Sequence, residues 1–222
     1  MKRYADNAAR FLLARNVKVL LIACNTASAY AIEELTATVP VHVIGAVEPG
    51  ARAAVRASRS GSMGVIGTLG TVRSGAYPRA IAKLAGKDVR ITARACPLLV
   101  PLVEEGWLDG EVPTLVARRY LDELHREAPE LDVLVLGCTH YPLLRPLLQQ
   151  LANERWDRPI TLVDSAETMA QETAEILARD GLLANDGAAP ALEVCVTDEA
   201  RIDEVGARFL GHPLVGVQRV DL

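Results

Sequence analysis

The 222-residue sequence lacks the features of several large classes of protein. It has no long basic run and a net charge of −4, so direct binding of nucleic acid is not expected. Its longest apolar stretches, such as Val17–Ala23, are far too short to span a bilayer. The first residues, Met1–Tyr4, lead into an amphipathic pattern and not into the apolar core of a signal peptide. We therefore expect a cytoplasmic protein that does not bind membranes.

Paired cysteines and recognisable cofactor motifs are also absent. Cys24, Cys96, Cys138 and Cys195 lie far apart and form no CxxC pair. This spacing disfavours a disulfide framework, a zinc knuckle and a thiol redox protein. The histidines show no metal-ligand spacing, and the lysines have no partner motif for pyridoxal phosphate. We therefore expect no metal and no cofactor.

Glycine recurs every third residue over Gly61–Gly70. The run matches neither a Walker A loop nor a dinucleotide-binding fingerprint. We interpret it as turns that flank a buried strand. We interpret Cys96 and Cys195 as small buried apolar residues, which is the usual role of a free cysteine.

Short apolar segments alternate with helical patterns along a chain that is half hydrophobic and 23% charged. Seven segments predict strands: Val17–Ala23, Val41–Ile44, Met63–Ile66, Val89–Thr92, Val133–Leu136, Ile160–Val163 and Leu192–Thr197. Eight predict helices: Ala5–Arg15, Ala27–Leu35, Glu48–Ser58, Ser74–Leu84, Pro113–Glu127, Pro142–Asn153, Ser165–Asp180 and Glu199–Leu210. The strand segments are apolar without clean alternation, which is typical of parallel strands buried on both faces. The pattern therefore predicts an α/β fold with parallel sheets covered by helices on both sides.

Local signals mark some of the predicted boundaries. Ser165 is a candidate N-cap, and Gly181 follows Asp180 as a helix stop. Pro142 stands near a helix start, where its missing N–H costs nothing. The composition of Ala184–Pro190 predicts a loop.

A short pattern occurs twice in the sequence. The first copy is Val17–Thr26 and the second is Leu131–His140, and each is an apolar run that ends in Cys and two polar residues. Seven strands could form one sheet, but the repeat argues for two pseudo-symmetric, doubly wound domains with the site in the cleft between them. We expect residues 1–44 and 160–222 to form the first domain and residues 45–159 the second.

Each copy presents a thiol, Cys24 or Cys138, where a strand ends and a helix begins. Ligands of open α/β sheets bind beyond the C-terminal ends of the strands. A helix N-terminus favours a bound carboxylate, and it favours a thiolate over a thiol. Apolar burial has the opposite effect on a thiol. The residues alone leave open which effect dominates at each cysteine.

Two such thiols on opposite sides of a small molecule suit inversion at a carbon acid. A thiolate removes the proton from one face, and a thiol donates a proton to the other. Asn25, Thr26 and Thr139 supply short polar groups for a substrate's ammonium or carboxylate, and His140 is placed to assist proton movement at Cys138. Each residue singly has a plainer explanation, because a Cys at a strand end is usually packing and an Asn or Thr at a helix start is usually a cap. The repeat of the whole unit favours the catalytic interpretation.

At these residues the chain resembles glutamate racemase, a cofactor-independent family that supplies D-glutamate for peptidoglycan. The matching segments are Ala23–Ala29 and Gly137–Leu143, supported by Gly64–Thr68, Ala95–Leu98 and Val163–Ser165. The resemblance implies a catalytic acid/base pair, Cys24 and Cys138, and substrate-binding residues, Asn25, Thr26, Thr139 and His140. Glu104 resembles a family residue near the cleft, and its alternative role is that of a solvated helix end.

The resemblance also has one departure. The family normally begins with a strand leading into Asp-Ser-Gly, followed by a Tyr-Gly pair, and both contribute to the substrate site. This sequence starts downstream of both, so we expect about one strand and one helix of the family fold to be missing. Either the start codon is misassigned or this form is impaired, and we expect the 222-residue form itself to have reduced solubility and little racemase activity.

Other functions stay open at this point. A form with impaired catalysis would suit a binding protein, for example an inhibitor of DNA gyrase, as some family members are reported to be. The wider superfamily includes aspartate racemases with the same two-domain fold. The sequence also leaves open whether the protein is a homodimer.

Overall fold

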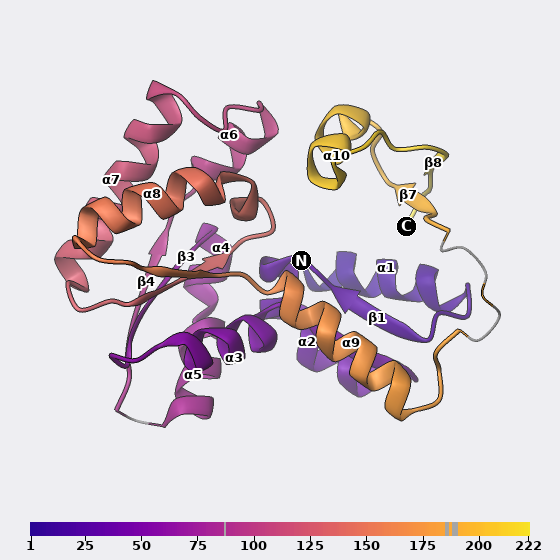
Figure 1. The fold of residues 1–222 in the computed structure, drawn as a ribbon. Coiled ribbons are helices and arrows are strands. Elements are labelled where there is room, and N and C mark those ends of the chain that lie inside the picture. Colours follow the sequence, from indigo (N-terminus) through magenta and orange to yellow (C-terminus); the bar gives the residue numbers. More distant parts are fainter. Residues whose placement is uncertain (87, 185–186, 188–190) are drawn as a thin grey trace.

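The computed structural model describes residues 1–86, 88–184, 187 and 191–222. Helices and parallel strands alternate along the chain (Figure 1). The strands form one four-stranded sheet and two separate two-stranded sheets in the described residues. The predicted α/β class with parallel sheets is confirmed.

We call the four-stranded sheet and the helices packed on it the second half of the fold. The sheet contains β3 (Ser62–Gly67), β4 (Arg90–Ala95), β5 (Val133–Gly137) and β6 (Thr161–Val163). The spatial order is β4-β3-β5-β6, and all neighbours are parallel. Every residue of β3 and β5 is buried, as the continuous apolar runs predict.

Helices cover both faces of this sheet. One face packs through Val133 and Val135 against α3 (Val47–Ala57) and α5 (Ala76–Ala85). The other packs through Leu134 and Leu136 against three helices: α6 (Leu99–Glu104), α7 (Glu111–Glu127) and α8 (Arg145–Trp156). Successive side chains of β5 point to opposite faces, so one strand contributes to two cores.

The first half of the fold is built on a smaller sheet. β1 (Val19–Ile22) and β2 (His42–Gly45) are parallel, and α1 (Lys2–Leu13) and α2 (Asn25–Thr38) pack around Leu20. α9 (Ala166–Arg179) contacts Ile44 through Met169.

The last described segment adds α10 (Ile202–Leu210) and a second small sheet. This sheet pairs β7 (Val194–Val196) with β8 (Val217–Arg219) (Figure 1). The predicted loop at Ala184–Pro190 falls largely outside the described residues, which include Ala184 and Gly187 of that segment.

One expectation about β1 is wrong. We expected strands buried on both faces, yet Leu21 is 48% exposed and β1 is only partly buried. Within the described residues β1 pairs only with β2, so its other edge has no strand beside it. A strand with one partner and a half-covered face leaves alternate side chains in solvent.

Three short elements were not expected from the sequence. They are α4 (Leu69–Ser74), α6 and β8. The expected helix at Ser74–Leu84 begins at Ala76, because Gly75 adopts a positive φ of 65° that separates α4 from α5. The expected helix at Pro142–Asn153 is a 3₁₀ turn, η1 (Tyr141–Leu144), that continues into α8.

The boundaries of α9 follow the predicted signals with one correction. Ser165 occupies the N-cap position, but its side chain makes no capping bond. Asp164 accepts the backbone N–H of Ala166 at 3.0 Å in its place. The helix ends at Arg179, and Gly181 follows with a positive φ, as expected.

One strand lies on the other side of the expected domain division. We expected the chain to return to the first domain at residue 160, but β6 pairs with β5 and extends the four-stranded sheet to Val163. Val163 also packs in the core beside Val135 and Ala51, which anchors it to this sheet. The rest of the division, 1–44 with 160–222 against 45–159, stays a prediction.

Close packing against β3 requires one glycine in the strand. A Cβ on Gly64 would lie 2.3 Å from Leu131 Cδ1, which is inside contact distance. Our interpretation of the run Gly61–Gly70 as turns that flank a buried strand is right for Gly61, which precedes β3, but Gly64 and Gly67 lie within β3 and Gly70 lies in α4. None of the helices described here is both long and apolar enough to cross a membrane.

Candidate active site

The two cysteine turns face each other across the two halves of the fold. Cys24 is the N-cap residue of α2, two positions after the end of β1. Cys138 directly follows β5 but, unlike the expected helix start, it lies two residues before His140, the N-cap of the 3₁₀ turn η1. The hydroxyl of Thr139 donates to the carbonyl oxygen of Ala23 at 3.0 Å. The residue after one cysteine therefore bonds to the residue before the other, which brings the two predicted turns together.

The two thiols have different surroundings. Cys24 is exposed, whereas Cys138 is 6% exposed. Burial raises the pKa of Cys138 to about 11, although the backbone N–H groups of His140 and Tyr141 counter part of this rise. Negative charge at Cys24 also raises the pKa of Cys138, in keeping with the contact between the two turns.

Cys138 is joined to a short polar chain through His140. Its Sγ lies 3.9 Å from Nδ1 of His140, and Nε2 of that ring lies 3.1 Å from Oε1 of Glu104. The ring of Phe209 meets the His140 ring edge to face, with centroids 5.1 Å apart. A carboxylate at Nε2 favours the tautomer that carries its proton there, which leaves Nδ1 able to accept the proton of the thiol.

Asn25 is held by a tyrosine from the other half of the fold. Tyr77 of α5 is fully buried and donates its hydroxyl to Oδ1 of Asn25 at 2.7 Å. Burial raises the pKa of Tyr77, and Asp164 and Cys138 raise it further. The phenol therefore stays protonated and is a permanent donor, so Oδ1 of Asn25 is occupied and its amide NH₂ is the group left for a ligand.

Thr26 is held at the contact between α2 and α4. Its Oγ1 lies 2.7 Å from that of Thr68 and 3.0 Å from that of Thr71. The two partners lie 3.1 Å from each other, so the three hydroxyls form a closed triangle. This triangle fixes the start of α2 against the second half of the fold.

The structure thus gathers all six predicted site residues around the two turns, namely Cys24, Asn25, Thr26, Cys138, Thr139 and His140. Sequence reasoning did not find Tyr77 or Phe209. Each reaches the site from a distant part of the chain, and no motif marks it. Glu104 lies beside His140, which supports a place at the cleft over a solvated helix end.

The other two cysteines lie outside this arrangement. Cys96 is fully buried, as expected, and its burial raises the pKa of its thiol. Cys195 lies on β7 and is only partly buried, so its expected burial is wrong. The two-stranded β7–β8 sheet is too small to enclose it. Across the described ranges, no group of three or more His, Cys, Asp or Glu side chains gathers to hold a metal.

Two parallel-sheet halves that present matched cysteine turns define the class of the protein. The family model described as Asp/Glu/Hydantoin racemase matches residues 3–173, which is most of the chain. Amino-acid racemases are isomerases that invert the configuration at Cα.

Comparison with individual proteins narrows the class. The chain is 49% identical over 220 residues to a glutamate racemase of Syntrophus aciditrophicus, covering 99% of this chain and 79% of that one. The solved structure of the glutamate racemase isoform RacE1 of Bacillus anthracis is 34% identical, with a TM-score of 0.90 and coverage of 100% and 80%. That of the Francisella tularensis enzyme in complex with D-glutamate is 28% identical, with a TM-score of 0.89 and coverage of 99% and 80%. The chain belongs to the glutamate racemase family.

Proposed function

We propose that this chain interconverts L- and D-glutamate, at the low rate expected of this form, with Cys24 and Cys138 as the two acid/base groups. The observation that carries the proposal is the bond from Thr139 to Ala23, which holds the two cysteine turns against each other. A substrate Cα between them would have one sulfur near each face. The relatives support glutamate as the substrate, because a close structural neighbour is described with D-glutamate bound.

Each turnover uses the thiols in opposite protonation states. A thiolate on one side removes the Cα proton, and the thiol on the other side donates its proton to the opposite face of the carbanion. The reaction leaves the two protonation states exchanged, so turnover in the reverse direction uses the same pair. No redox change occurs, and the atoms balance without a co-reactant.

The neighbouring groups assist at defined atoms. His140 Nδ1 accepts the proton of Cys138, and the Glu104 carboxylate stabilises the imidazolium that results. The amide NH₂ of Asn25 donates to a substrate carboxylate oxygen, while Thr26 and Thr139 shape the opening from either side. Donors at the enolate-like oxygen of the carbanion would contribute about 3 kcal/mol each.

Several finer expectations belong to the same proposal. The reaction needs no cofactor, and the D-glutamate formed would serve peptidoglycan synthesis in the cytoplasm. The site lies in the cleft between the two proposed domains.

Single substitutions of the two thiols test the proposal. Cys24→Ser and Cys138→Ser should each slow racemisation by about a thousandfold, because a hydroxyl is a far weaker acid than a thiol. Racemisation can be followed by circular dichroism of L-glutamate, and Cys195→Ser is the matched control outside the site. Activity within about tenfold of the unsubstituted chain in either variant would contradict the two-thiol mechanism.

A further inference from the structure

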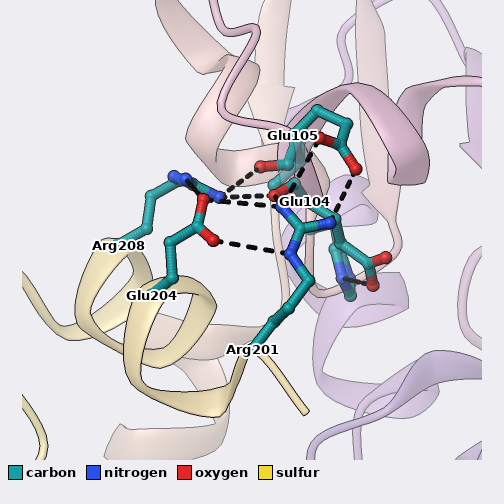
Figure 2. Close-up of polar contacts among 7 residues, drawn as sticks. Glu104, Glu105, Arg201, Glu204 and Arg208 are labelled. Carbon is teal, nitrogen blue, oxygen red and sulfur yellow. Dashed lines mark hydrogen bonds and ion pairs between the residues drawn. The ribbon is translucent and has the colours of Figure 1, made fainter.

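The C-terminal helix α10 lies against the end of α6, next to the proposed site. α6 ends at Glu104, whose side chain reaches His140. Two arginines of the C-terminal segment, Arg201 and Arg208, point at this helix end (Figure 2). The contact therefore joins Arg201 and Arg208 to Glu104, which lies about a hundred positions earlier in the chain and bonds His140.

Arg208 binds the carbonyl end of α6 directly. Its Nη1 donates to the carbonyl oxygens of Val103 at 3.0 Å and Glu104 at 2.8 Å. These carbonyls are among those that a helix leaves unsatisfied at its C-terminus, where a cation is favoured. Nη2 of Arg208 lies 3.0 Å from Oε1 of Glu204, which orients the guanidinium from within α10.

Arg201 makes a second attachment at the same place. Its Nη1 lies 2.6 Å from Oε1 of Glu105, and its Nη2 donates to the carbonyl oxygen of Glu104 at 2.9 Å. α10 is therefore attached through two arginines, which share the carbonyl oxygen of Glu104 and the carboxylate of Glu204 (Figure 2). Removal of one guanidinium should loosen Glu104 without releasing the helix.

The residue after Arg208 completes the contact. Phe209 packs its ring against His140 and joins the buried core of the second half. Arg208 and Phe209, which are adjacent in α10, thus act on the pair formed by Glu104 and His140. Arg208 holds the backbone that carries Glu104, and Phe209 holds the ring that Glu104 bonds.

We propose that Arg208 is a positioning residue that, together with Phe209, keeps the Glu104–His140 pair aligned with the thiol of Cys138. The role of Cys138 as an acid/base group rests on the proposed function. The alignment itself is a property of the folded chain and is measured on the thiol without turnover. The two proposals can therefore fail independently of each other.

Site-resolved alkylation measures the alignment. The chain is treated with iodoacetamide, and the alkylation rates of Cys138 and Cys24 are obtained from the same digest by mass spectrometry. Arg208→Met, which keeps the length of the side chain, should lower the rate of Cys138 relative to Cys24 by about threefold or more, because His140 no longer accepts the thiol proton efficiently. Arg118→Met is the matched control, since the one ion pair of Arg118 among the described residues is an exposed pair with Glu154 at 3.4 Å. An unchanged or increased ratio in Arg208→Met would overturn the proposal.

A double-mutant cycle and a conservative variant separate positioning from general packing. Glu104→Gln should reproduce the fall, and Glu104→Gln combined with Arg208→Met should cause little further change, because both act through one pair. Additive effects would contradict this. Arg208→Lys, which returns a cation to the helix end, should recover about half of the lost ratio. This variant also serves if Arg208→Met does not fold, and a ratio in Arg208→Lys as low as that of Glu104→Gln would then overturn the proposal.

Discussion

The Cys24 turn and the Cys138 turn have the same local order of strand and Cys but different surroundings. Cys138 follows β5, a strand buried on both faces in the middle of a four-stranded sheet. Cys24 follows β1, which has one partner in the described residues and an exposed Leu21. One thiol is buried and the other is exposed. A repeated sequence unit thus reproduces a local order of strand and Cys, while the burial of the thiol that it presents depends on the rest of the fold.

Core truncations should give the largest contrast between the halves. Leu134→Ala removes a fully buried side chain from β5 and should lower the free energy of unfolding by about 3 kcal/mol. Leu21→Ala removes a half-exposed side chain from β1 and should cost less than about 1 kcal/mol. Urea unfolding of both variants checks the difference. Equal losses would show that β1 is as tightly packed as β5.

The alkylation rates of Cys24 and Cys138 should also differ strongly. With a pKa of about 11, roughly one Cys138 thiol in a thousand is ionised at about pH 8. We expect Cys24 to be alkylated about a hundredfold faster at this pH, because it is exposed. Mass spectrometry of the digest after treatment with iodoacetamide measures both rates, and equal rates would contradict the contrast between the two turns.

The pH dependence gives a second check on the same thiol. A raised pKa means that the thiolate fraction of Cys138 is still climbing above neutral pH, so its alkylation rate should rise about tenfold per unit from about pH 8 to pH 10. The measurement is the pH series of site-resolved rates. A plateau of the Cys138 rate below about pH 9 would contradict the burial argument.

The hydroxyls of Tyr77 and Tyr30 both bond α2 to the second half of the fold, and the losses of stability on removing them should differ by less than those of the two core truncations. Tyr77→Phe leaves the buried Oδ1 of Asn25 without its donor and should cost about 1 to 2 kcal/mol of stability. Tyr30→Phe removes an exposed bond to the carbonyl oxygen of Gly70, at 3.2 Å, and should cost no more than about 0.5 kcal/mol. Thermal unfolding of the two variants measures the pair. A larger loss in Tyr30→Phe would mean that the exposed contact carries the attachment.

Much of this arrangement could be predicted from the sequence, because it depends on local patterns. The apolar runs at Met63–Ile66 and Val133–Leu136 predict the buried strands, and the repeat predicts that two cysteines stand at strand ends. The short elements could not be predicted in the same way. α6 has six residues with Pro101 inside it, and β8 has three, so neither is long enough to show a period.

The remaining features depend on contacts between distant residues. The bonds from Arg208 reach carbonyl oxygens of α6 that lie 104 and 105 residues earlier in the chain. The bond from Tyr77 reaches Asn25, which lies 52 residues earlier. Nothing in the local sequence indicates such partners. The exposure of Leu21 likewise depends on what stands beside β1, because an apolar run alone predicts a buried strand.

The most direct test of the account is the position of deuterium during the first turnovers in D₂O. Two thiols on opposite faces require that L-glutamate be converted to D-glutamate deuterated at Cα, while the L-glutamate that remains stays unlabelled at early times. Proton NMR of the two separated enantiomers provides this measurement. Deuterium that enters the remaining L-glutamate as fast as it enters the product would indicate a single base serving both faces, and it would contradict the pairing of Cys24 with Cys138.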